Sequence, residues 1–246
     1  MKNLNYKIMR KIAFALLIFL TLSLNAQNDG VIKFLGIPVD GTKEEMISRL
    51  KQKGFVFNNE IMFQGEFNGS KIYGGIEAYH DRVYQIRFFY DNEGFDKSVV
   101  INKFNSLVLQ YDTNEKYMSN INLDKVIRNI DSYLIDTYED LAYELKRGKV
   151  YMAQYYYTVD KDPSDTTGYF QYKKEQYRKF SNSIMLLKEE DRDKFLHDIT
   201  SPEVFYMHRL EQDMVRFYIT EGIGYGKFNI MIEYFNRRNA PNGEDL

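Results

Sequence analysis

Few residues in this sequence could do chemistry, and those few are scattered along the chain. The three histidines are His80, His197 and His208, and no two of them have the helical spacing of metal ligands. No G-x-S-x-G motif marks a nucleophile elbow, although a Ser/His/Asp triad, which is recognised by geometry, stays open. There is no cysteine, which excludes disulfides, thiolate catalysis and cysteine-ligated metals. The sequence therefore predicts no cofactor and favours binding over catalysis.

Paired carboxylates are the main catalytic alternative. Glycoside cleavage needs two acids about 5–10 Å apart across a cleft. Glu66, Glu77 and Glu233 lie on expected strands, although strand acids more often face solvent. The alternative function is thus an extracytoplasmic hydrolase that acts on polysaccharide or peptide through such a pair.

Two loops resemble ligand-binding motifs only in part. A phosphate loop is followed by a helix, whereas a strand follows Gly222-x-Gly224-x-Gly226, which predicts a hairpin loop. Calcium loops place ligands at positions 1, 3 and 5 and glycine at 6. After Asp160 and Asp162 the third aspartate falls at position 6 and glycine at 9, so we expect a flexible connection without a metal.

Tyrosine is abundant, with 21 Tyr beside 18 Phe and no Trp. In an expected strand over 149–158, alternation places Tyr151, Tyr155 and Tyr157 on one face. If the opposite face is the core, these three rings form an exposed cluster of the kind that marks binding surfaces. The alternative is that a helix over 170–187 covers them. The three tyrosines are the predicted binding site, with a protein or glycan partner.

The N-terminus has the three parts of a secretory signal peptide. A basic segment precedes the apolar run from Ile12 to Leu24, and the small residue Ala26 follows. The run is shorter than the roughly 20 residues of a spanning helix. We therefore expect cleavage near Ala26 and a secreted or periplasmic product with no further membrane span; the alternative is an uncleaved anchor.

Removal of residues 1–26 changes the charge balance of the product. The segment contains four basic residues and no acid, which leaves 29 basic against 35 acidic residues and a net charge of −6. Such a chain has no bulk attraction for nucleic acid or anionic lipid. The absence of cysteine also excludes a lipid anchor at the cleavage site.

Patterning predicts a β-α-β-β-β-α module over residues 27–111. A strand over 31–35 leads to a helix over 43–53, which Thr42 and Glu45 begin as a capping box. Strands over 61–67, 71–79 and 82–90 follow, and Asn68-Gly69 supplies a hairpin turn. The apolar face of the third strand is expected to contain Tyr84, Ile86, Phe88 and Tyr90. A helix over 95–111 has the spacing to cover it.

Residues 112–246 form either a second α+β half or a continuation of the same domain. Ile127, Ile130 and Leu134 have helical spacing, and a helix is expected near 137–147. Helical spacing returns over 170–199, and strands over 214–219 and 228–235 close the chain. The predicted fold class is α+β, an antiparallel sheet packed by helices on one side, in one body or in two similar halves.

This order of elements resembles the small module of BLIP-like and SmpA/OmlA-like secreted bacterial proteins. The residues that carry the resemblance are Gly36-Ile-Pro-Val-Asp-Gly41, Lys53-Gly54-Phe55 and the hairpins from Ile61 to Tyr90. The tail from Asn239 to Leu246 resembles uncharacterised secreted proteins of this kind. The resemblance is specific over about residues 31–90 and implies binding or scaffolding, with no catalytic motif.

Overall fold

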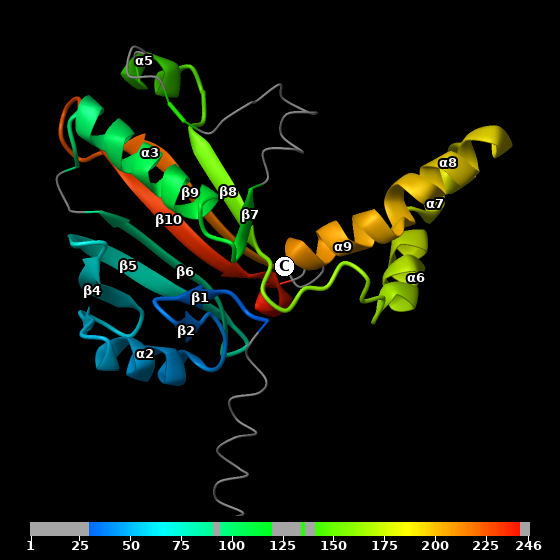
Figure 1. Ribbon diagram of the computed structural model, residues 1–246, viewed down its shortest axis with the longest axis horizontal. Coiled ribbons are helices and arrows are strands. Elements are labelled where there is room, and N and C mark those ends of the chain that lie inside the picture. Colours follow the sequence, from blue (N-terminus) through cyan, green and yellow to red (C-terminus); the bar gives the residue numbers. More distant parts are fainter. Residues whose placement is uncertain (1–29, 91–93, 120–133, 136–140, 242–246) are drawn as a thin grey trace, which may run out of the picture.

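The computed structural model of the chain describes residues 30–90, 94–119, 134–135 and 141–241 (Figure 1). Two sequence predictions lie outside these residues: the signal segment 1–26 and the helical spacing of Ile127 and Ile130. Two others lie partly outside them: the helix expected near 137–147 and the tail over 239–246. Within the described ranges the fold is α+β, as predicted, and a single antiparallel sheet runs through both parts of the chain.

Eight strands form the main sheet in the order β3-β4-β5-β6-β10-β9-β8-β7. Their bounds are Val56–Phe57 (β3), Met62–Phe67 (β4), Ser70–Tyr79 (β5), Arg82–Tyr90 (β6), Tyr117–Ser119 (β7), Met152–Tyr157 (β8), Asp213–Glu221 (β9) and Phe228–Asn236 (β10). All neighbouring strands are antiparallel, and β6 pairs with β10, so the last strand joins the two parts of the chain. A small separate ladder pairs β1 (Lys33–Phe34) with β2 (Ile37–Pro38).

Helices α2 (Lys43–Gln52) and α3 (Lys97–Asp112) cover one face of this sheet. The expected capping box begins α2: Glu45 N donates to Thr42 Oγ1 at 3.2 Å, and Thr42 N donates to Glu45 Oε2 at 3.1 Å. Val100, Phe104 and Val108 of α3 are buried against the sheet. α5 (Leu141–Lys146) adds Leu141 to the same core.

The core between sheet and helices is aromatic. Phe34 packs against Phe88 and Tyr234 with ring centroids 5.1 Å and 5.3 Å away. Gly74 is needed where β5 faces this core, because a Cβ there would lie 2.5 Å from the Arg87 carbonyl oxygen. The composition alone does not say whether the many tyrosines pack in the core or form a binding surface. In the structure they contribute largely to packing.

Four helices project from the sheet as an arm (Figure 1). The arm consists of α6 (Tyr169–Lys179), α7 (Ser181–Leu186), α8 (Glu189–Thr200) and α9 (Pro202–Leu210). The base of the arm meets the sheet, where Leu210 of α9 packs on Met214 and Tyr156. Among the described residues, no helix is long and apolar enough to cross a membrane.

Candidate functional site

The three predicted site tyrosines lie in the core. Tyr151, Tyr155 and Tyr157 are exposed to 6%, 0% and 4%. The Tyr155 ring stacks on Tyr111 of α3 at 5.2 Å, and its hydroxyl donates to Asp112 Oδ1 at 2.8 Å. The predicted exposed cluster is therefore wrong, because α3 covers this face of β8. The alternative cover, a helix over 170–187, is also wrong, since α6 and α7 belong to the projecting arm.

The sheet face opposite α2 and α3 is more accessible, and we call it the open face. Strand register places two adjacent rows of side chains in the middle of this face. The polar row contains Gly75, Arg87, Glu233, Arg216 and Gln154, one each from β5, β6, β10, β9 and β8. The apolar row lies two residues along each strand and contains Tyr73, Phe89, Met231, Tyr218 and Met152. Directly opposed side chains of this kind contact one another across a sheet.

Glu233 is the centre of the polar row and the most buried charge on it. Its side chain is 5% exposed, and both Nε and Nη2 of Arg216 donate to its Oε2, at 2.8 Å and 2.6 Å. Gln85 Nε2 donates to Oε1 at 3.2 Å, and the Tyr218 hydroxyl donates to the same oxygen at 3.3 Å. These donors fix the carboxylate in place, as a buried charge requires.

A second carboxylate, Glu77, lies beside the polar row. Arg87 Nη2 is 2.5 Å from its Oε1, and the Tyr84 hydroxyl donates to its Oε2 at 2.6 Å. Tyr84 reaches Glu77 because a bulge in the β5–β6 ladder leaves it without an opposite residue. The expectation that Tyr84 shares a face with Ile86 is thus wrong. Burial, together with the hydrogen bond to Glu77, raises the pKa of Tyr84 to about 12.

The apolar row offers contact area next to these charges. Its five side chains are all half-buried, and Tyr73 and Phe89 stack with ring centroids 6.2 Å apart. A shallow pocket of about 140 Å³ lies where this row meets Arg87, lined also by Met62 and Gly75. A Cβ at Gly75 would make a tight contact, 3.2 Å from Met62 Sδ.

The structure places two of the three acids named as catalytic candidates on the same face of the sheet. Glu77 and Glu233 both lie on the open face, but each already accepts from an arginine and from a tyrosine hydroxyl. The two rows contain no histidine, serine or cysteine. Glu66 lies exposed on β4, outside both rows.

The remaining sequence candidates occupy turns and helices. His80 and Asp81 form the β5–β6 turn, with φ angles of 45° and 62°. His197 on α8 and His208 on α9 are both exposed, and desolvation lowers the pKa of His208. Gly222, Gly224 and Gly226 lie in the β9–β10 hairpin loop, as predicted.

Two aspartates of the 160–168 loop, Asp162 and Asp165, bind to protein groups. The Asp162 and Asp165 carboxylates accept from the backbone nitrogens of Ser164 and Thr167, and Asp165 also pairs with Arg209 at 2.9 Å. Burial lowers the pKa of the neighbouring Lys161, whose Nζ lies 2.8 Å from Asp213.

The open face as a site was missed by sequence reasoning. The mixed character of Gln85, Arg87 and Phe89 was the available signal, since a purely solvent-facing strand side carries fewer large apolar residues. Comparison with known proteins adds nothing to this geometry: no protein-family model, curated protein or solved structure matches the chain.

Proposed function

We propose that the protein is exported and acts as a non-enzymatic binding protein whose partner docks on the open face. The observation that carries this proposal is the apolar row, five aligned side chains that stay half-buried on a sheet face away from α2 and α3. Aligned on a rigid sheet, these side chains need little ordering when a partner binds.

The chemistry of the face favours a protein partner over a glycan. Its accessible residues are tyrosine, phenylalanine, methionine and arginine, the types enriched at protein interfaces. Arg87, whose side chain is 53% exposed, provides a charged donor next to the apolar row. Below Arg87, the ion pair and hydrogen bonds of Glu233 hold the neighbouring side chains in one arrangement.

Site-specific photo-crosslinking in the producing cells tests the docking face. A photoreactive phenylalanine analogue replaces Phe89 or Tyr73, and the matched control replaces Leu109, an exposed residue on α3. We expect protein adducts from the two open-face positions and none from the control. Adducts from Leu109 alone would refute the assignment, and a saccharide attached at Phe89 would identify a glycan partner instead.

Export is tested separately from docking. The segment before Gln27 has the basic, apolar and small-residue parts of a signal peptide. Mass spectrometry of the protein recovered outside the cytoplasm is expected to find Gln27 at the N-terminus. Intact Met1 on membrane-bound protein would contradict the export proposal and leave the open face unaffected.

A further inference from the structure

The arm exposes large apolar side chains far from the sheet. Phe170 and Tyr177 on α6 are 83% and 41% exposed, and Met185 and Leu186 at the end of α7 are 67% and 88% exposed. No residue of α7 is buried. Exposed apolar side chains gathered on one element are typical of interaction surfaces.

The two longest helices of the arm carry opposite charge. α6 contains four basic residues and one acid, whereas α8 contains five acids and two basic residues. Lys174 and Arg178 are four residues apart on α6, and Glu189 and Asp193 are four apart on α8. Like charges at this spacing repel within each helix, so each pair favours an opposite charge nearby.

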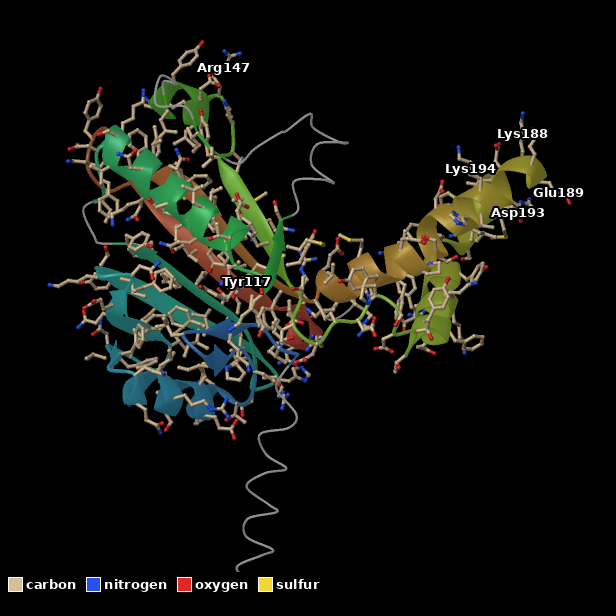
Figure 2. All side chains as sticks on the ribbon, in the orientation of Figure 1. Tyr117, Arg147, Lys188, Glu189, Asp193 and Lys194 are labelled. Atoms are coloured by element: carbon tan, nitrogen blue, oxygen red, sulfur yellow. The ribbon has the colours of Figure 1, made fainter. Side chains whose placement is uncertain are left out.

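The opposite charges of α6 and α8 are not paired with each other among the described residues. No ion pair joins α6 to α8 in the described part of the protein, where Lys188 pairs with Glu190 within the arm and Arg209 of α9 pairs with Asp165. The side chains of Glu189 and Asp193 project from the far end of the arm, away from the sheet (Figure 2). Both side chains are exposed there, so a partner can reach them.

We infer that the arm binds the arm of a second copy of this chain. In a two-fold arrangement, basic α6 of one copy lies against acidic α8 of the other, and the same contact forms twice. The apolar side chains of α6 and α7 supply buried area between the two charged contacts. A second copy is the partner that these charges favour, because the complementary charge of each helix is present on the same arm.

Charge exchange between two variants tests this inference. One variant is Lys174→Glu/Arg178→Glu, and the other is Glu189→Lys/Asp193→Lys. Analytical ultracentrifugation of the full protein, in the form in which cells produce it, is expected to show dimers at low salt that dissociate as salt increases. Each variant alone is expected to be monomeric. An equal mixture of the two is expected to dimerise, because both contacts are again of opposite charge.

The matched control is Lys53→Glu/Lys146→Glu, which reverses two exposed charges outside the arm and is expected to remain dimeric. Circular dichroism of each variant confirms that the helices are intact. A wild-type protein that stays monomeric at low salt overturns the inference. So does a dimer that both arm variants retain, or a mixture that stays monomeric while both variants are folded.

Discussion

Glu233 shows how a single residue defines the character of the open face. A carboxylate in the middle of a strand is an ordinary solvent-facing residue unless its neighbours enclose it. Here Arg216 and Tyr218 of β9 and Gln85 of β6 bind both of its oxygens. The Arg216 guanidinium also lies over the Phe235 ring at 5.0 Å, so the ion pair has an apolar neighbour.

Replacement of Glu233 by alanine is expected to lower the free energy of unfolding by about 3 kcal/mol, the lower end for a broken buried ion pair. The low end applies because the Arg216 side chain is 30% exposed and can be partly hydrated. The measurement is urea unfolding followed by circular dichroism. The control Glu66→Ala, at an exposed position on β4, is expected to change stability by less than about 0.5 kcal/mol. Equal midpoints for the two variants would show that Glu233 is not enclosed in solution.

At the scale of elements, α2 depends on its first turn. Thr42 and Glu45 satisfy each other's backbone nitrogens, and Met46 and Leu50 are fully buried behind them. The helix is ten residues long, which is too short to be stable by itself in water. Its cap and its buried side therefore act together.

Thr42→Ala is expected to destabilise the protein by about 1 kcal/mol, the usual loss for an N-cap. Thermal unfolding measures the change. Ser106→Ala is the comparison, since its exposed hydroxyl only bonds back to the Asn102 carbonyl within α3 and contributes little. If Thr42→Ala unfolds at the wild-type temperature, the capping box does not form in solution.

The sequence predicted elements better than it predicted faces. Turn residues and periodicity are local, so the capping box, the Asn68-Gly69 turn and the strands of β4, β5 and β6 could be placed. Alternation also predicted correctly that the side chains of Tyr151 and Met152 point to opposite faces of the sheet. Which side α3 covers is decided by β8 pairing with β9, and a local pattern carries no information about that contact. The bulge turns the Tyr84 side chain to the other face of β6, and the local pattern carries no information about that bulge either.

At the scale of the whole molecule, buried tyrosines make stability sensitive to alkali. Burial raises the pKa of Tyr234 to about 12, and it raises the pKa of Tyr90, Tyr111 and Tyr117 as well. Unfolded tyrosine titrates near pH 10. Above that pH the folded state binds more protons than the unfolded state. These tyrosines therefore make their full contribution to the stability of the folded state below about pH 10 and a progressively smaller one above it.

Stability is therefore expected to fall as pH rises from about 10 toward 12, by roughly 3 kcal/mol for Tyr234 alone. Lys161 acts in the opposite direction, because its lowered pKa makes the unfolded state bind more protons just below pH 10.5. The tyrosines outnumber it, so the net change is a loss. Urea midpoints across this range, with tyrosinate absorbance in parallel, measure both effects. A constant midpoint up to pH 12 would contradict burial of these hydroxyls.

The position of β10 sets the order in which this molecule can be built. β10 is the last strand along the described chain, yet it lies between β6 and β9 in the middle of the sheet. The strands made earlier cannot complete the sheet until these nine residues arrive. While the chain is being synthesised, the edge of β6 lacks the strand with which it pairs in the folded protein. The pairing that completes the sheet therefore joins residues far apart in sequence and is slow. A chain that stays open until its final strand emerges can be threaded through a narrow channel before it folds.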